Sequence, residues 1–453
     1  MLIILNKIIF NKLKWIKYFK RKKPINSFKF NIKKSNRNFY KSLKCNKTVF
    51  ILECKKASPS KGIINKKFNI SKIIYIYKKY ANAISILTDE KYFKGNFKFL
   101  KIASKNTNLP ILCKDFIIDE YQIYLARFYK ANAILLMLSI LSNKKYKKLK
   151  LIAENLNMCI LTEVLTKNDL KRAIKLNAKI IGINNRNLND LSINLKRTFN
   201  LSTKIPKNII IICESGIENN IQIRKINKYV HGFLIGSSLM SKKNLTNSIY
   251  KILLGENKIC GLTSKTDIKL IYKNGIIYGG LIFINNSLRK INIKKAYNII
   301  LNVDLKYIGI FNNENIKNII KICKYLKLYA IQLHGNENQN YINILKKLLP
   351  FKIQIWKAKS IEKKLYVQKF KFIKKYIYDN KNGGTGENFN WNLIKKVNNL
   401  NNIILAGGIN IKNCNKAINL GCIGLDFNSG IEIKPGKKNK IILKSLFNIL
   451  RNY

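Results

Sequence analysis

The stretch ILECKKASPSKG at residues 51–62 and the stretch KICGLT at residues 258–263 decide how this chain is interpreted. Each begins as a short apolar strand and ends abruptly in reactive or phosphate-compatible residues. Each also opens a series of predicted strands that closes on glycine-bearing loops. The two series predict two barrels of one class, joined in a single chain.

Eight strands are predicted in each half of the chain. The first set is 49–53, 83–87, 111–114, 133–138, 159–163, 179–183, 209–214 and 232–236, and the second set is 258–261, 277–284, 307–311, 329–333, 353–357, 375–379, 402–407 and 421–427. The segments between them are long enough for a helix and its loops, which predicts a parallel sheet with helices outside. We therefore expect an α/β protein with two fused (β/α)8 barrels, the first preceded by an N-terminal helical extension.

Length and composition agree with two domains, predicted as residues 1–255 and 256–453. A single barrel takes about 250 residues, and 47% hydrophobic residues suffice for two cores. Residues 1–23 have the pattern of a basic amphipathic helix, for which packing on the first barrel is favoured over a membrane-surface or transit role. No apolar run approaches the ~18 residues of a membrane span, so no membrane partner is expected.

The net charge of +65 admits two interpretations. A nucleic-acid or acidic-membrane binder would carry such a charge. A compositional bias is favoured, because lysines are spread along the chain and not gathered into one patch. We therefore expect no specific nucleic-acid partner, although the field would steer anionic substrates.

The cysteines and histidines indicate the cellular compartment of the protein and whether a metal site is expected. Nine cysteines are scattered without a CxxC pair, which is typical of reduced thiols and predicts a cytoplasmic protein. The two histidines, His231 and His334, lie at no metal-ligand spacing, so no metal site is expected.

The two halves repeat a small-residue pattern near their ends. Ser215 and Gly216 are followed by Gly236 and Ser237, whereas Gly407 and Gly408 are followed by Asn428 and Ser429. Both sets come directly after the predicted seventh and eighth strands, where barrels of this class commonly bind phosphate through backbone N–H groups. The duplication predicts a phosphate site in each half.

Charged and amide side chains follow the strands of the first half. They are Glu53, Lys55, Lys114, Glu163, Asn184 and Glu214. Side chains at the carboxyl ends of barrel strands converge on one mouth, where lysines and glutamates can divide acid and base work. A salt-bridged rim is the structural alternative, and it is disfavoured because these residues recur at strand ends.

The first half resembles indole-3-glycerol-phosphate synthase. The matching stretches are FILECKKASPSKG (50–62), ISILTDEKYFKGNF (84–97), ILCKDFIIDEYQIYLAR (111–127), LLMLSIL (135–141), LTEV (161–164), GINNRNL (182–188), CESGI (213–217) and GFLIGSSLM (232–240). The resemblance implies ring closure of a carboxyphenylamino-deoxyribulose phosphate with loss of CO2 and water. It implies Lys114 as general acid, Glu163 as base, Lys55 as a residue that shares acid work, and Glu53, Asn184 and Glu214 as orienting residues. It also implies a substrate and phosphate pocket lined by Ser58, Arg186, Ser215, Gly216, Gly236 and Ser237.

The second half places Cys260 on its first strand and Asp379 at the end of its sixth. A lone cysteine in a strand is more often a core residue, but a thiolate and a carboxyl group beside a phosphate site could pass a proton across a substrate. Arg289 follows the second strand and could hold an anionic substituent, or it could be a solvated loop cation.

This half resembles phosphoribosylanthranilate isomerase. The matching stretches are KICGLT (258–263), YGGLIF (278–283), IQLHGNE (331–337), IWKA (355–358), YDNKNGGTGENFNW (378–391), LAGGI (405–409) and GLDFNSGIE (424–432). The resemblance implies an Amadori rearrangement with Cys260 as base, Asp379 as acid and Arg289 on the anthranilate carboxylate. It implies a phosphate site at Gly383, Gly384, Thr385, Gly386, Gly407, Gly408, Asn428 and Ser429. His334 could be structural or substrate-binding, and the loop at 286–289 reads Asn-Ser-Leu-Arg where the family usually has Ser-Pro-Arg.

Together the two resemblances imply a fused, bifunctional tryptophan-pathway enzyme. Its expected partners are phosphorylated, anthranilate-derived small molecules; neither reaction needs a cofactor, and a monomer is expected. A histidine-pathway isomerase on twin barrels is disfavoured, because its chemistry favours paired aspartates after strands one and five. A non-catalytic basic protein on a decayed barrel is disfavoured because the lysine and asparagine excess lies mainly outside the motifs at the predicted mouths.

Overall fold

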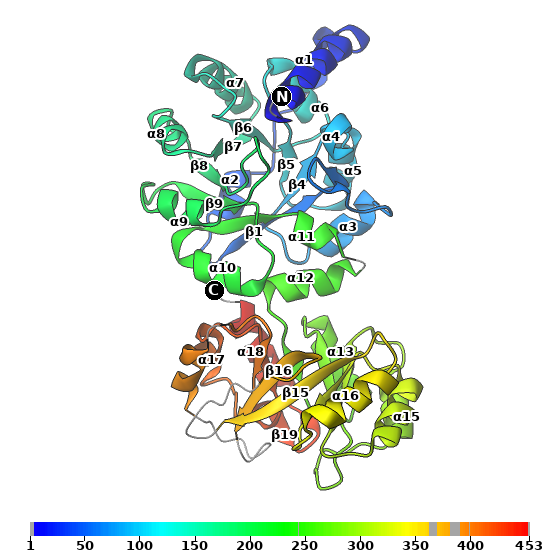
Figure 1. Cartoon of the computed structure of the whole chain (residues 1–453). Coiled ribbons are helices and arrows are strands. Elements are labelled where there is room, and N and C mark those ends of the chain that lie inside the picture. The colour runs from blue at the N-terminus through cyan, green and yellow to red at the C-terminus, as the bar shows by residue number, and fades with distance from the viewer. Residues whose placement is uncertain (1–3, 243, 362–368, 381–389, 398, 452–453) are drawn as a thin grey trace. The chain divides into compact units, whose positions relative to one another are not determined.

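The computed structural model describes residues 4–242, 244–361, 369–380, 390–397 and 399–451. The chain forms two compact units, and the division between them falls within helix α12 (Leu245–Leu253), with residues 219–221 grouped in the second unit. Each unit is built around one closed barrel of eight strands (Figure 1). The predicted fold class is confirmed.

The first barrel closes in the order β1-β10-β9-β8-β7-β6-β5-β4, with parallel neighbours throughout. Its strands are β1 (Val49–Cys54), β4 (Ala83–Leu87), β5 (Ile111–Lys114), β6 (Ala133–Met137), β7 (Cys159–Val164), β8 (Ile180–Asn184), β9 (Ile210–Glu214) and β10 (Gly232–Ile235). Its helices are α3 (Ile70–Tyr77), α4 (Glu90–Phe93), α5 (Lys98–Asn106), α6 (Glu120–Phe128), α7 (Asn143–Asn155), α8 (Lys167–Lys175), α9 (Lys196–Ser202), α10 (Asn220–Ile226) and α11 (Ser237–Met240). A small hairpin of β2 (Ala57–Ser58) and β3 (Gly62–Ile63) follows β1.

The second barrel closes in simple chain order. Its strands are β11 (Lys258–Ile259), β12 (Tyr278–Ile282), β13 (Lys306–Phe311), β14 (Ala330–Leu333), β15 (Gln354–Ile361), β16 (Ile373–Asn380), β17 (Ile403–Leu405) and β18 (Gly424–Phe427). Its helices are α13 (Lys265–Lys273), α14 (Ile293–Ile300), α15 (Ile316–Leu326), α16 (Gln339–Leu348), α17 (Cys414–Asn419) and α18 (Lys440–Arg451). A hairpin of β19 (Glu432–Lys434) and β20 (Lys437–Lys438) precedes α18.

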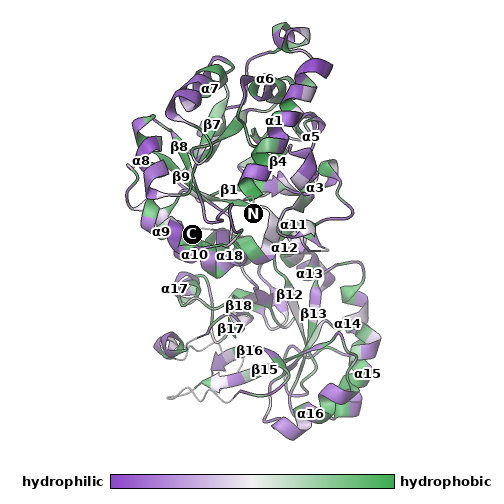
Figure 2. Cartoon of the chain, turned by 45° about the horizontal axis from the view of Figure 1, so that its top comes forward, coloured by the Kyte–Doolittle hydropathy of each residue, from purple (hydrophilic) through white to green (hydrophobic). Residues whose placement is uncertain are grey.

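The abundant asparagines act locally as helix caps. Asn69, Asn292 and Asn338 each accept a hydrogen bond from a backbone N–H in the first turn of the helix that follows. Such caps satisfy N–H groups that the helix itself leaves unbonded. The helices of each unit carry both hydrophilic and hydrophobic residues (Figure 2), whereas strands such as β1 are buried throughout.

The predicted N-terminal helix is present as α1 (Ile4–Lys22), with an additional short helix α2 (Phe39–Leu43) after it. Ile8 of α1 belongs to the apolar core of the first barrel. The ammonium group of the buried Lys12 lies 2.8 Å from Asp89 and 2.7 Å from Asp115, which follow β4 and β5. Thus α1 packs on the first barrel through both an apolar and an ionic contact. No helix among the described residues is both long and apolar enough to cross a membrane.

Candidate active sites

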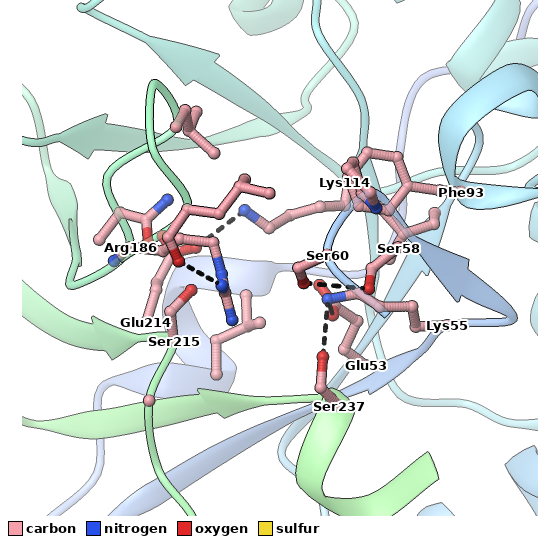
Figure 3. A pocket seen from close by; sticks show the side chains of 18 of the residues that line it. Glu53, Lys55, Ser58, Ser60, Phe93, Lys114, Arg186, Glu214, Ser215 and Ser237 are labelled. Carbon is pink, nitrogen blue, oxygen red and sulfur yellow. Dashed lines mark hydrogen bonds and ion pairs between the residues drawn. The ribbon is translucent and has the colours of Figure 1, made fainter. Parts of the chain in front are cut away.

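Six predicted residues meet at the mouth of the first barrel, because the carboxyl ends of its parallel strands share one edge. Glu53, Lys55, Lys114, Glu163, Asn184 and Glu214 all line one pocket there. Figure 3 shows Lys114 reaching toward Glu214, and Lys55 lying beside Glu53 and Ser237.

Lys114 lies between two carboxylates at the end of β5. Its Nζ donates hydrogen bonds to Glu163 Oε2 at 3.1 Å and to Glu214 Oε2 at 2.8 Å. Burial would lower the pKa of Lys114, but the charges of Glu214, Glu163 and Glu53 outweigh burial and raise that pKa above its ordinary value. The amine therefore carries its proton at neutral pH and is placed to donate it.

The two carboxylates around Lys114 have different surroundings. Asn184 Nδ2 donates to Glu163 Oε1 at 3.1 Å, so both oxygens of Glu163 have partners. Glu214 Oε1 is buried without a hydrogen-bond partner among the described residues, and it lies against Gly182, where any side chain would collide with it. Burial raises the pKa of Glu214 to about 7, with Lys114 opposing the rise and Glu163 adding to it. One carboxylate is thus fixed as an acceptor and the other is poised to titrate.

A second lysine–glutamate pair lies at the end of β1. Lys55 Nζ is 2.5 Å from Glu53 Oε1 and donates to Ser237 Oγ at 3.5 Å. Glu53 in turn packs against Gly236, where a methyl group would clash with its carboxylate. The pair therefore connects strand β1 to the loop after β10.

Small residues and one arginine complete the polar side of this pocket. Ser215 and Gly216 follow β9 with φ values of +64° and +88°, and Gly236 and Ser237 follow β10. Positive φ is readily reached by glycine, so the main chain can turn its N–H groups toward a ligand there. Arg186 donates to the carbonyl of Leu191 at 2.8 Å, and burial lowers the pKa of its guanidinium group.

The pocket also has many apolar lining residues. Ile4 and Ile8 of α1 line it together with Phe93, Phe116, Leu135, Met137, Leu188, Leu191 and Ile193. Sequence reasoning did not single out these residues. Ser60, whose Oγ lies 3.4 Å from that of Ser58, was also missed. The pocket can therefore hold a molecule that carries both apolar and strongly polar groups.

The second barrel brings Cys260 and Asp379 to one pocket, which lies at the carboxyl ends of its strands. Cys260 follows β11 and is 8% exposed, and Asp379 lies near the end of β16. Burial raises the pKa of the Cys260 thiol, with Lys258 opposing the rise. Burial also raises the pKa of Asp379 to about 6, and Asp426 adds to that rise. An acid that protonates near neutrality thus shares a pocket with a thiol.

A buried ion pair lies beside this thiol and was not foreseen. Lys258 Nζ donates to Asp426 Oδ2 at 2.5 Å, and the Lys258 side chain is fully buried. Lys258 and Cys260 are two positions apart along an extended backbone, so their side chains point to the same face of the sheet. The alternation of side chains along the stretch KICGLT could have predicted that Lys258 lies beside the Cys260 thiol.

His334 lies next to Asp379, with Nε2 at 3.8 Å from Oδ2 of the carboxylate. Its Nδ1 lies 3.2 Å from the side-chain amide nitrogen of Gln332. Burial lowers the pKa of His334 to about 4, with Lys258 and Lys357 adding to the fall. The histidine is therefore neutral near pH 7, and its ring lies beside the Asp379 carboxyl group.

The predicted anion-binding residues of this half lie around the same pocket. Arg289, Gly407, Gly408, Asn428 and Ser429 line it. Gly407 and Gly408 have φ values of +83° and +61°. Gly383, Gly384, Thr385 and Gly386 lie outside the described residues. The Arg289 guanidinium forms an ion pair with Glu432, a partner that sequence reasoning missed.

Within the described part of the chain, no three His, Cys, Asp or Glu side chains are grouped so that they could hold a metal ion.

Comparisons with known proteins match both halves. The family model "Indole-3-glycerol phosphate synthase" covers residues 5–252, and "N-(5'phosphoribosyl)anthranilate (PRA) isomerase" covers residues 257–449. The chain is 56% identical over 450 residues to the tryptophan biosynthesis protein TrpCF of Buchnera aphidicola subsp. Diuraphis noxia, covering 99% of each chain. It is 47% identical over 450 residues to TrpCF of Salmonella typhi, again with 99% of each chain covered. A solved phosphoribosyl anthranilate isomerase from Thermus thermophilus is 26% identical, with a TM-score of 0.39, and the match covers 43% of this chain and 98% of that one.

Proposed function

Because this chain belongs to the indole-3-glycerol phosphate synthase family in its first half and to the phosphoribosylanthranilate isomerase family in its second, we propose that each barrel works through the residues at its own mouth. The chain is a bifunctional enzyme of tryptophan biosynthesis, with a carboxy-lyase domain in its first half and an isomerase domain in its second half. The isomerase makes the compound that the synthase consumes.

In the second barrel, Asp379 protonates the ring oxygen of the ribosyl group, and the sugar opens to an iminium ion. The thiolate of Cys260 then removes the proton from the adjacent carbon, and the resulting enol-amine becomes the amino-ketone of the product. The placement of Cys260 and Asp379 in one pocket supports these roles. The raised pKa of Asp379, about 6, favours the protonated form that an acid requires.

In the first barrel, Lys114 donates a proton to the substrate carbonyl oxygen while the ring carbon that bears the carboxylate attacks the carbonyl carbon. CO2 leaves, Lys114 regains a proton from solvent and donates it so that the hydroxyl group departs as water, and Glu163 accepts the proton released as the indole ring forms. The position of Lys114 between Glu163 and Glu214 is the observation that carries this assignment. Lys55 shares the acid work, and Glu53, Asn184 and Glu214 orient the reacting groups.

The remaining residues bind the two substrates. We assign the phosphate groups to Ser215, Gly216, Gly236 and Ser237 in the first barrel, and to Gly407, Gly408, Asn428, Ser429 and the stretch 383–386 in the second. Ser58 and Arg186 line the first pocket, and Arg289 receives the anthranilate carboxylate in the second. We place the functional division between Gly255 and Glu256, in the interval between the two family matches. We also propose that the protein is a monomer and that it is located in the cytoplasm.

Two single variants test the proposal, with each half-reaction supplied with its own substrate. Lys114→Met should lower synthase turnover by roughly 10²–10⁴-fold, the usual contribution of a positioned acid, and should leave isomerase turnover unchanged. Cys260→Ser should do the reverse. Cys422→Ser is the matched control, because Cys422 does not line the second pocket. Loss of both activities in either variant, or of neither, would contradict the assignment.

A further inference from the structure

Arg289 is held by a carboxylate far away in sequence. Its Nε lies 2.9 Å from Glu432 Oε2 and 3.2 Å from Oε1, and its Nη2 lies 2.8 Å from Oε2. The two residues are 143 positions apart, and their side chains are 11% and 4% exposed. A two-point contact of this kind fixes the plane of a guanidinium group, not merely its position.

This contact occupies only one edge of the guanidinium group. Arg289 has five N–H donors, and Glu432 takes those at Nε and one at Nη2. Arg289 lines the pocket that contains Cys260 and Asp379, whereas Glu432 is not part of the pocket lining. Glu432 therefore lies behind Arg289, and no described residue accepts a hydrogen bond from Nη1, so that edge can meet a ligand.

Glu432 is itself fixed and kept charged. Its Oε1 accepts hydrogen bonds from Lys438 Nζ at 2.7 Å and from the backbone N–H of Gly436 at 3.1 Å. Burial would raise the pKa of Glu432, but the bonds from Arg289 and Lys438 outweigh burial and lower that pKa below its usual value. Two cations share this one carboxylate, so the three side chains carry one net positive charge.

The same cluster reaches the loop assigned to phosphate. Lys438 Nζ also donates to Asn428 Oδ1 at 3.2 Å, and Lys438 is held at its backbone N–H by Asp267. A methyl group on Gly261, the residue after Cys260, would lie 2.7 Å from Arg289 Cδ and 2.8 Å from Asn428 Oδ1. The β19–β20 hairpin thus ties the arginine and the phosphate loop together beside the thiol.

We propose that Glu432 is a positioning residue that aims Arg289 at the ring carboxylate of the substrate, and that Lys438 fixes this cation relative to the phosphate loop. The inference rests on the proposed isomerase function. The exposed Leu288 stands in the loop where the family usually has proline. Glu432 constrains the arginine side chain directly, whatever the stiffness of that loop. Specificity for a carboxylated ring then depends on a residue that does not touch the substrate.

The test compares two substrates in Glu432→Gln and in a control, Lys434→Gln, which alters an exposed residue of the same hairpin. With phosphoribosylanthranilate, Glu432→Gln should raise KM about tenfold or more, because a misplaced binding group loses much of its effect, and kcat should change less. With phosphoribosylaniline, which lacks the carboxylate, the variant and the wild type should have equal kcat/KM. Lys434→Gln should match the wild type on both.

Equal losses on both substrates would show a merely structural role and overturn the inference, as would an unchanged KM for phosphoribosylanthranilate. If Glu432→Gln does not fold, Glu432→Asp keeps the charge, shifts the carboxylate by one methylene, and must show the same selective rise in KM. A wild type without isomerase activity would contradict the proposed function, whereas an active wild type with an insensitive Glu432 would contradict this inference alone.

Discussion

In the proposed function, the two mouths divide acid and base work between different residue pairs. In the first, one cation lies between two carboxylates, and both Glu163 and Glu214 contact Lys114. In the second, a thiol and a carboxyl group share one pocket, and a neutral imidazole faces the carboxyl group. The first arrangement keeps an amine protonated, whereas the second raises the pKa of its carboxyl group to about 6.

The second arrangement makes a prediction about pH. The reaction requires protonated Asp379 and deprotonated Cys260. As the pH rises above 6, the fraction of protonated Asp379 falls while the fraction of Cys260 thiolate rises by the same factor. Isomerase kcat/KM should therefore be flat from pH 6 up to the raised pKa of the thiol. Below pH 6 Asp379 is already protonated while the thiolate continues to decline, so kcat/KM should fall about tenfold per pH unit. The measurement is the pH profile of isomerase kcat/KM.

The synthase activity of the same samples controls for acid damage to the protein. A profile that stays flat down to pH 4 would mean that Asp379 has the pKa of an ordinary exposed carboxyl group, and the raised pKa given for it would be wrong.

Residue types at strand ends could be predicted from the sequence, but their partners could not. Lys114 and Glu163 were predicted at one mouth because barrel strands end at one edge. The bond between Arg289 and Glu432 spans 143 positions and follows no period, so no sequence pattern reports it. Nor does the pattern report that Glu214 Oε1 is buried beside Gly182, which depends on the register of β8 and β9.

At the scale of elements, helix α1 is part of the first active site. Ile4 and Ile8 line its pocket, and Lys12 forms a buried bridge to Asp89 and Asp115. Burial would lower the pKa of Lys12, but Asp115 and Asp89 outweigh burial and raise it. Asp115 directly follows Lys114, so the bridge links α1 to the backbone of the proposed acid.

Lys12→Met should therefore destabilise the first barrel by about 3–5 kcal/mol, the usual cost of leaving buried charges without their partner. We expect a fall in the urea concentration at which half of the synthase activity is lost. The corresponding urea concentration for isomerase activity should not change. Lys17→Met on the exposed face of α1 is the matched control. Equal midpoints for the two variants would show that the bridge contributes nothing to stability.

Strand positions were predicted closely because each barrel strand is a short apolar run bounded by turn-forming residues. The strand predicted at 111–114 coincides with β5 (Ile111–Lys114). The ends of β15 (Gln354–Ile361) and β16 (Ile373–Asn380) were missed, because polar residues such as Lys359 and Ser360 extend a strand only through pairing with its neighbour. Periodicity cannot detect an extension that depends on the partner strand.

At the scale of the whole molecule, one chain contains two complete barrels, each with its own pocket and its own proposed acid and base. Among the residues that the structure describes, the lining of each pocket comes from its own unit. The interpretation of the +65 charge as compositional bias stays a prediction. Because each barrel has its own complete set of reacting groups, the two steps should be separable by mutation and recombinable by mixing.

The most direct test of this account is to mix two inactive chains. Phosphoribosylanthranilate is supplied to Lys114→Met, to Cys260→Ser and to an equimolar mixture, and formation of indole-3-glycerol phosphate is followed. We predict that Lys114→Met alone accumulates the isomerised intermediate, that Cys260→Ser alone leaves the substrate untouched, and that the mixture restores the overall conversion. A mixture that forms no indole-3-glycerol phosphate would contradict the claim that the two barrels of this chain are independent catalysts of consecutive steps.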